Sequence, residues 1–271
     1  MYAFSFERPA SVADAARLAA SGATLLAGGQ TLLASMKLRL SAPEQLADLG
    51  HIAALTGIRR DGNTLVIGAM ARHAQVAESD IVRTALPGLA DLAGGIGDRQ
   101  VRALGTLGGS IANNDPAACY PAAALGLGAT VHMAHEGASR EMAADDFFQG
   151  LFATALEPGE LITGLSFPVP QCAAYAKFKQ PASRFAMVGV FVAKTAAGVR
   201  VAVTGAGNGV FRHAGLEAAL NASFTPEAAA TVQVDPSDLS SDLHATAAYR
   251  ANLISVQTQR AVAKALGLPS R

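Results

Sequence analysis

The sequence predicts an α+β protein made of more than one compact unit. Its 271 residues exceed the usual size of a single domain, so two or three units are expected. Up to Pro168 and Pro170, short apolar strand patterns alternate with glycine turns and helical patterns. Beyond these prolines, apolar runs joined by short turns predict an antiparallel sheet that is followed by helices.

The first unit is expected to span residues 1–57 and to place a strand, a glycine turn and a helix in succession. A capped helix is expected from Ser11 to Gly22, because a serine precedes an acidic residue by three positions and a glycine closes the pattern. A buried strand over residues 23–27 then leads into the glycine turn 28–31, and a second helix follows from Leu32.

The second unit is expected to span residues 58–169. A turn signal at Asp61-Gly62 stands between two apolar runs and predicts a β-hairpin. The passage 94–110 is rich in glycine and separates helical patterns on either side. The expected helices cover residues 71–77, 80–92 and 116–127, and the expected strands cover residues 129–134 and 161–167.

Pro168 and Pro170 mark the expected boundary of a third unit, residues 170–271, because proline interrupts regular backbone hydrogen bonding. The pattern beyond them favours antiparallel strands first and helices afterwards. Strands are expected over residues 174–178, 188–193 and 199–204, and helical spacing over residues 239–268.

Composition excludes several classes of function. The apolar fraction of 51% and the charged fraction of 15% favour a globular protein with extensive buried surface, including surface buried against other subunits. Basic and acidic residues balance at 21 each, which leaves no broad positive field for nucleic acid. Cys119 and Cys172 form no C-x-x-C pair, so an iron–sulfur or zinc site is not expected in this chain. No apolar stretch approaches a bilayer span, and the cytoplasm is the expected location.

Two glycine loops are the candidates for binding a diphosphate. Gly28 and Gly29 allow a close approach of the backbone, and amide groups at the start of the next helix favour an anion. Alone, such a turn is more often structural. The passage 105–116 repeats the glycine pair and a hydroxyl before a helix expected at Pro116, so two loops can clamp one diphosphate from opposite sides. Neither loop matches the dinucleotide fingerprint G-x-G-x-x-G or a P-loop.

Five sequence motifs in chain order carry a resemblance to a known family. They are LAGGQTLLASMKLRL over residues 26–40, IGAMARH over 67–73, IGDRQVR over 96–102, the second glycine loop over 105–116, and DLHATAAYR over 242–250. Together they resemble the FAD-binding medium subunit of molybdenum hydroxylases, which includes the flavoprotein subunits of carbon monoxide dehydrogenase and the flavin domain of xanthine dehydrogenase. The resemblance covers nearly the whole chain. It implies a fold of the vanillyl-alcohol oxidase and p-cresol methylhydroxylase type, with two α+β subdomains and a C-terminal domain of the carbon monoxide dehydrogenase flavoprotein type.

The resemblance also implies which residues hold FAD. The two glycine loops are expected to contact its diphosphate through Ala27, Gly28, Gly29, Gln30, Thr31, Thr106, Gly108, Gly109 and Ser110. Ile96 matches a contact near the flavin ring, and Ile162 matches one on the strand before the prolines. Lys179, with Lys177 as the second choice, matches a lysine near the flavin, and Tyr175 is a further candidate.

The sequence departs from the family at Cys119, where an acidic residue usually binds a cofactor hydroxyl. A thiol is a weak hydrogen-bonding partner. Either Asn114, Asp115 or Tyr120 substitutes for the acid, or FAD is held less tightly by about 1 to 3 kcal/mol.

Other polar pairs receive a structural interpretation. His132 and His135 share no helical face and have no evident third ligand, so surface histidines are expected rather than a metal site. The pair Asp145-Asp146 is expected to begin a helix, where negative charge is stabilising. Arg99 and Arg102 either steer an anion towards the second glycine region or are solvated loop charges.

The resemblance implies the FAD-binding electron-transfer subunit of a heterotrimeric molybdenum hydroxylase, a heterotrimer that can pair into a dimer. Its partners are an iron–sulfur small subunit and a molybdopterin large subunit, and electrons leave FAD for NAD, a quinone, oxygen or another acceptor. The chain needs no catalytic residue of its own for this role. Two alternatives stay open: a stand-alone FAD oxidoreductase, which needs an acid or base beside the flavin, and a non-enzymatic assembly protein with the same fold.

Overall fold

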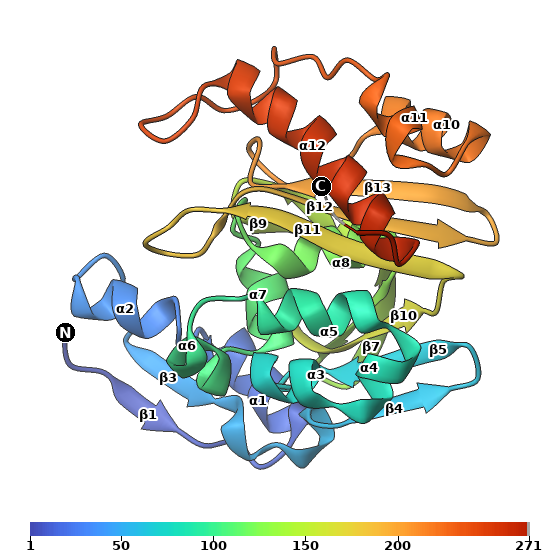
Figure 1. Cartoon of the computed structure of the whole chain (residues 1–271). Helices are drawn as coiled ribbons and strands as arrows, with labels where there is room; N and C mark the ends of the chain where they lie inside the picture. Colours follow the sequence, from blue (N-terminus) through green and yellow to red (C-terminus); the bar gives the residue numbers. More distant parts are fainter. Residues whose placement is uncertain (270–271) are drawn as a thin grey trace.

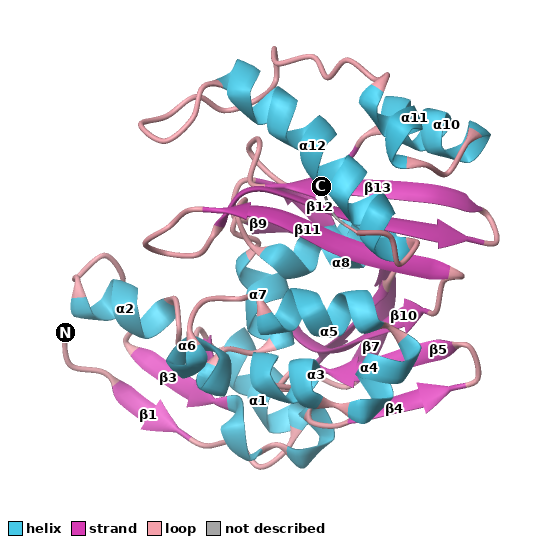
Figure 2. Cartoon of the chain, viewed as in Figure 1, coloured by secondary structure: helices cyan, strands magenta, loops and turns pink. Residues whose placement is uncertain are grey.

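A computed structural model describes residues 1–269 of the chain (Figure 1). These residues form sheets of three, five and four strands and a small two-stranded pair. Helices lie between the sheets and on the outer face of the C-terminal sheet (Figure 2). The α+β class and the antiparallel C-terminal sheet with its helices are therefore confirmed.

The N-terminal sheet is parallel and has the order β1-β3-β2. The expected capped helix is present, since the Ser11 side chain accepts a hydrogen bond of 3.0 Å from the Asp14 amide and Gly22 has φ of 98°. The elements of this part are β1 (Ser5–Glu7), α1 (Val12–Ala20), β2 (Thr24–Leu26), α2 (Leu32–Lys37), β3 (Gln45–Asp48), and the 3-10 turns η1 (Leu49–His51) and η2 (Ala53–Leu55).

The middle sheet is antiparallel and has the order β4-β5-β10-β6-β7. The hairpin expected at Asp61-Gly62 is present. Strand β7 was missed, because it is a largely exposed edge strand without an apolar pattern. The elements are β4 (Ile58–Asp61), β5 (Thr64–Gly68), β6 (Thr130–His135), β7 (Ala138–Ala143), α9 (Ala144–Phe147), β8 (Phe148–Gly150), β9 (Ala153–Thr154) and β10 (Leu161–Pro168).

The helices between β5 and β6 require two corrections. The single helix expected over 80–92 is wrong, because Pro87 has no amide hydrogen to continue it and the chain turns at Leu86. The helix expected to start at Pro116 starts at Cys119 instead. The helices are α3 (His73–Glu78), α4 (Asp80–Ala85), α5 (Pro87–Gly94), α6 (Arg99–Leu104), α7 (Leu107–Asn113) and α8 (Cys119–Leu127).

The C-terminal sheet has the order β11-β12-β13-β14, with antiparallel neighbours as expected. The helix expected over 239–268 is shorter, because Thr246 caps it and the preceding residues form an irregular loop. The elements are β11 (Cys172–Lys179), β12 (Ala186–Thr195), β13 (Gly198–Thr204), β14 (Phe211–Arg212), α10 (Ala214–Ala222), α11 (Pro226–Ala230) and α12 (Ala247–Ala265).

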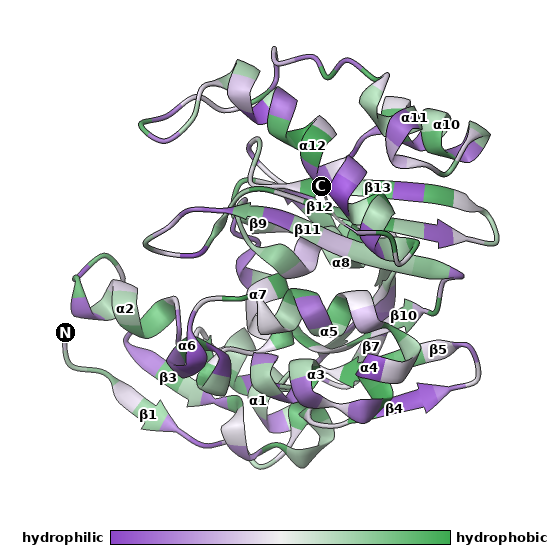
Figure 3. Ribbon diagram, in the orientation of Figure 1, coloured by the Kyte–Doolittle hydropathy of each residue, from purple (hydrophilic) through white to green (hydrophobic). Residues whose placement is uncertain are grey.

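Helix α8 is central to the fold, because all of its residues are buried. It packs against the inner face of β12 and β13, whereas α12 packs on the outer side of β11 and β12. The ribbon of the sheet and of the helices beneath it is coloured mainly as apolar (Figure 3). The start of α8 is therefore held firmly beside the loops described below. Within residues 1–269, no helix combines the length and the apolar character that a bilayer crossing requires.

Candidate functional site

A cavity of about 590 Å³ lies between the N-terminal sheet, the glycine-rich passage and the C-terminal sheet. Figure 1 shows the loop between β11 and β12, in yellow, projecting towards α2 on the same side of the molecule. The wall contains both glycine loops. Among its other residues are Leu25, Ser35, Ser41, His73, Ile96, Val101, Asp115, Cys119, Leu156, Glu160, Leu161, Ile162, Lys177, Ser183, Arg184 and Phe185.

The first glycine loop needs glycine for steric reasons. A Cβ atom added at Gly28 would collide with the carbonyl oxygen of Leu104 and would lie 2.8 Å from the Cα of Gly105. Gly29 has φ of 69°, a backbone region that residues with a side chain rarely adopt. The loop therefore packs directly on the backbone that precedes the second loop.

The first loop also carries free hydrogen-bond donors. Among the described residues, no protein acceptor is found for the backbone N–H groups of Gly28 to Leu32. Thr31 stands at the start of α2 and makes no side-chain cap bond. Several unpaired amides at one turn form a site that suits a negatively charged group, such as a diphosphate.

The second glycine loop differs, because its amides already donate within the protein. Leu107 donates to Ala71 over 2.9 Å, and Gly108 donates to Ala69 over 2.8 Å. The side chain of Thr106 caps α7 and accepts from the Gly109 amide over 3.1 Å. The second loop thus forms the first turn of a helix. A ligand can contact its backbone closely, but the loop has no free amides to donate to that ligand.

The two loops nevertheless meet. A Cβ atom added at Gly109 would lie 2.9 Å from Thr106 Oγ1 and 3.5 Å from the Cβ of Ala27. An added Cβ at Gly108 would lie 2.9 Å from the Cα of Ala69. Small residues on both loops therefore leave a narrow space between them for a ligand.

Positively charged side chains gather at one end of the cavity. Lys177 Nζ donates to the carbonyl oxygens of Gly95 and Arg184 over 2.9 and 3.0 Å, and it lies 3.4 Å from Cys119 Sγ. The Arg102 guanidinium donates to the carbonyl oxygen of Ile96 over 2.9 Å. These contacts fix the segment that carries Ile96 into the cavity wall.

The opposite part of the wall has an ion pair beside apolar residues. Arg140 donates to Glu160 through two nitrogens, at 2.5 and 2.6 Å, and the Glu157 amide donates to Glu160 as well. The hydrogen bond from Arg140 is the main cause that lowers the pKa of Glu160. Leu156 and Leu161 flank this carboxylate in the wall.

His73 is a buried ring behind the second loop and reaches the cavity wall. It is 5% exposed, and its Nδ1 atom has no hydrogen-bond partner among the described residues. Burial, and next the positive charge of Arg102, lower the pKa of His73 to about 4. Its ring lies 5.3 Å from that of Tyr120, whose pKa is raised by burial. The imidazole is therefore neutral at pH 7.

The residues predicted to hold FAD lie in the cavity wall except Asn114, Lys179 and the further candidates Tyr120 and Tyr175. Asn114 is buried and donates to the carbonyl oxygens of Gly150 and Ala153, so its amide holds the β8–β9 turn. Lys179 is exposed at the end of β11, next to a register shift in the pairing of β11 with β12. Lys177, the second choice, lies in the wall instead.

Several lining residues were missed by the sequence reasoning. His73 stands at the end of a motif that was recognised, and Arg184 and Phe185 lie on the turn after the first strand beyond the prolines. Glu160 and Leu156 stand on an irregular loop that carries no motif. Tyr175 and Tyr120 are buried outside the wall.

The other polar pairs have structural partners. His132 contacts Glu141 and Ser166 at 2.9 and 2.6 Å. Asp145 stands in the first turn of α9, as expected, and pairs with Arg200 from the C-terminal sheet at 2.6 Å. Arg99 begins the short helix α6. In the part of the chain that the structure describes, no three His, Cys, Asp or Glu side chains gather so that they could hold a metal ion.

The cavity fits FAD by two observations. The free amides of the first loop suit a diphosphate, and the absence of a side chain at Gly109 leaves room beside Ala27 of the first loop. Residues 2–170 match the family described as the FAD binding domain in molybdopterin dehydrogenase.

Individual proteins show the same relationship over the whole chain. The carbon monoxide dehydrogenase medium chain of Hydrogenophaga pseudoflava is 35% identical, with 96% of each chain covered. The nicotine 6-hydroxylase medium subunit of Paenarthrobacter nicotinovorans is 34% identical, with 97% of each covered. Among solved structures, reconstituted carbon monoxide dehydrogenase from Oligotropha carboxidovorans gives a TM-score of 0.90 at 32% identity over 99% of both chains. Quinoline 2-oxidoreductase from Pseudomonas putida 86 gives 0.90 at 28% identity over 98% of both chains.

Proposed function

The chain belongs to the family of FAD-binding subunits of molybdopterin dehydrogenases, and from this we propose that it is the electron-transfer subunit of a heterotrimeric molybdenum hydroxylase. In this proposal a small subunit with iron–sulfur clusters delivers electrons that a molybdopterin-containing large subunit has taken from the substrate. The present chain passes them to an external acceptor. Relatives that are medium chains of dehydrogenases and hydroxylases support this assignment.

The observation that carries the proposal is the cavity between the two glycine loops. In the part of the chain that the structure describes, the amides of Gly28 to Leu32 in its first loop have no protein acceptor. Its second loop places Gly108 and Gly109 against Ala69 and Ala27 without intervening side-chain atoms. One cofactor diphosphate at this position satisfies the free amides, which are costly to leave unpaired when water is excluded.

The residues of this chain bind and orient the cofactor. FAD, when bound, supplies the redox chemistry. The amides of the first loop would hold the diphosphate, with the help of Thr106 and Ser110 of the second loop, which also line the cavity. Ile96 and Ile162 provide apolar surface, and Lys177 provides a positive charge in the wall. Electron transfer requires no proton donor or acceptor from the protein, so we assign no catalytic residue.

We also propose the division of the chain into residues 1–57, 58–169 and 170–271, with the first two as subdomains of the vanillyl-alcohol oxidase type. In support, each of the three larger sheets takes all of its strands from one of these ranges. A cytoplasmic location stays a prediction of the same assignment.

A visible absorption spectrum of the purified chain tests the proposal. A yellow protein with one FAD per chain is expected, and a colourless folded chain that does not take up added FAD would support the assembly-protein alternative.

Co-purification then tests the partners. Isolation with an iron–sulfur subunit and a molybdopterin subunit is expected, whereas turnover of a substrate by the chain alone would support a stand-alone oxidoreductase.

A further inference from the structure

The segment Gly95 to Gly97 is held by three cationic side chains that come from three different elements. Lys177 of β11 donates to the carbonyl oxygen of Gly95 over 2.9 Å. Arg102 of α6 donates to those of Ile96 and Gly97 over 2.9 and 3.1 Å. Arg184, from the β11–β12 loop, donates to that of Gly97 over 3.3 Å. Three positive charges therefore converge on a short stretch of backbone in a chain with no net charge.

None of these cations has an anionic partner in the described part of the chain. Across residues 1–269, no carboxylate lies within 4.0 Å of the side-chain nitrogens of Lys177, Arg102 or Arg184. The carboxylates in the same cavity wall have other partners, because Asp115 accepts from the Ala117 amide and Glu160 pairs with Arg140. The partners of Lys177 are two carbonyl groups and the sulfur atom of Cys119.

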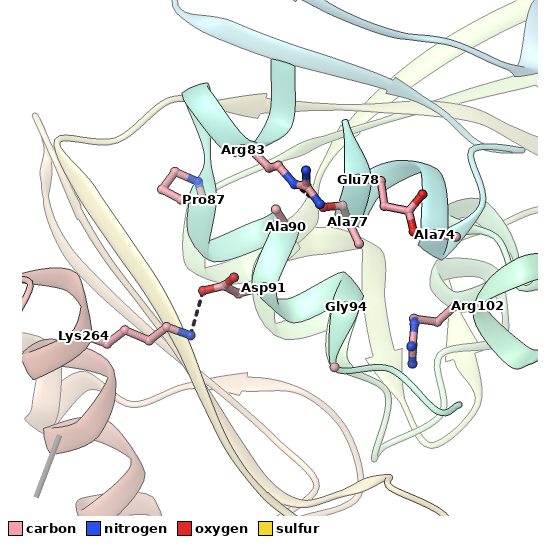
Figure 4. A pocket seen from close by; sticks show the side chains of 11 residues that line it. Ala74, Ala77, Glu78, Arg83, Pro87, Ala90, Asp91, Gly94, Arg102 and Lys264 are labelled. Atoms are coloured by element: carbon pink, nitrogen blue, oxygen red, sulfur yellow. Dashed lines mark hydrogen bonds and ion pairs between the residues drawn. The ribbon is translucent and has the colours of Figure 1, made fainter. Parts of the chain in front are cut away.

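Arg102 also borders a second, more open cavity on the far side of the segment (Figure 4). An ion pair of 2.9 Å joins Lys264 and Asp91 there, whereas no such bond is drawn to Arg102. The wall of that cavity also carries Glu78 and Asp91, but within residues 1–269 neither carboxylate forms an ion pair with Arg102. The positive charge of Arg102 is also the second cause, after burial, that lowers the pKa of His73 to about 4.

An unneutralised positive charge beside a cavity favours negative charge inside that cavity. Lys177 and Arg184 line the cavity directly, together with Ile96. Uptake of two electrons and one proton adds one net negative charge to a flavin. Charged groups near the ring are a means by which a protein tunes the redox behaviour of such a cofactor.

We propose that Lys177, assisted by Arg102 and Arg184, stabilises reduced FAD over oxidised FAD and so raises the reduction potential of the bound cofactor. The proposal rests on the proposed function, since it requires FAD in this cavity. Lys177 has the leading role because its ammonium group lies in the wall and contacts three segments at once: the Gly95 loop, the Arg184 loop and the start of α8. The thiol of Cys119 leaves the positive charge of Lys177 in place, whereas a carboxylate at that position would neutralise the ammonium group.

The test compares the midpoint potential of bound FAD in two variants with the same charge change on one strand. Lys177→Gln is expected to lower the preference for reduced over oxidised FAD about tenfold, which is about 30 mV for a two-electron couple. Lys179→Gln is the matched control, because Lys179 is exposed and outside the cavity wall. Lys177→Arg, which keeps the charge, is expected to restore most of the potential.

A second variant leaves Lys177 and its backbone bonds in place. Cys119→Asp puts a carboxylate near the ammonium group, offsets its positive charge and is expected to lower the potential of bound FAD. Equal potentials in Lys177→Gln and Lys179→Gln, or no shift in Cys119→Asp, would overturn the inference while leaving the proposed function standing. A wild-type chain that binds no FAD would overturn both.

Discussion

Gly28→Ala is the substitution that most sharply tests how the two loops fit together. The new Cβ would collide with the Leu104 carbonyl oxygen and lie 2.8 Å from the Cα of Gly105. Both neighbours are backbone atoms and cannot rotate away. Since carbon atoms pack at about 3.5 to 4.0 Å, the first loop must move by about 1 Å. Overpacking of this kind typically costs about 1 to 3 kcal/mol of folding free energy.

The movement also displaces the free amides of Gly28 to Leu32, so we expect FAD affinity to fall by at least about tenfold, or about 1.4 kcal/mol. Urea unfolding of the FAD-free chain measures the loss of folding free energy, and titration of FAD fluorescence measures the loss of FAD affinity. Gly94→Ala is the control, because its added Cβ would lie 3.8 Å from Ala77 and meet nothing closer. If Gly28→Ala had the same stability and the same FAD affinity as the wild type, the packing described for the loops would be refuted.

Three further substitutions probe the cavity and its surroundings. His73→Phe should make the FAD-free chain less sensitive to acid: the pKa of His73 is about 4 in the folded state, below its ordinary 6.5, so the unfolded chain binds this proton first. The free energy of unfolding of the wild type should therefore fall between pH 6.5 and 4, and this group should account for about 2 kcal/mol of the loss at pH 5. Urea unfolding at pH 7 and 5 measures this loss in the wild type and in the variant. An equal loss in both would show that the ring is not buried. Asn114→Gly should cost about 2 kcal/mol in thermal or urea unfolding, because the carbonyl groups of Gly150 and Ala153 lose their donor. Gly109→Leu should abolish FAD retention on gel filtration, since even its Cβ would lie 2.9 Å from Thr106 Oγ1; full flavin content would contradict this.

Local signals determined most of the elements that the sequence predicted. The capped start at Ser11 and the hairpin at Asp61-Gly62 depend on neighbouring residues alone, and both are present. The division of the expected helix 80–92 into α4 and α5 at Pro87 also had a local cause. The prediction of a single helix failed because apolar spacing was followed across this proline. Strand β7 carried no signal, because an exposed edge strand needs no apolar alternation.

The candidate site depended on tertiary contacts that a single sequence does not display. The choice between Lys177 and Lys179 depends on tertiary contacts, since Lys177 donates to the carbonyl oxygens of Gly95 and Arg184 whereas Lys179 is exposed. The second glycine loop resembles the first in sequence, yet its amides are bonded within the protein because Thr106 caps a helix and Ala69 and Ala71 accept the remaining bonds. These acceptors lie more than thirty positions away in the chain and have no signature of their own.

Amide hydrogen exchange with and without FAD tests the central claim most directly. The account predicts that FAD slows exchange at Gly28 to Leu32, whose amides have no protein acceptor within the described chain. Exchange at Leu107 to Ser110 should change much less, because those amides already donate to Ala69, Ala71 and Thr106. Bound FAD that left the exchange of residues 28–32 unaltered would contradict the assignment of the first loop as the diphosphate site.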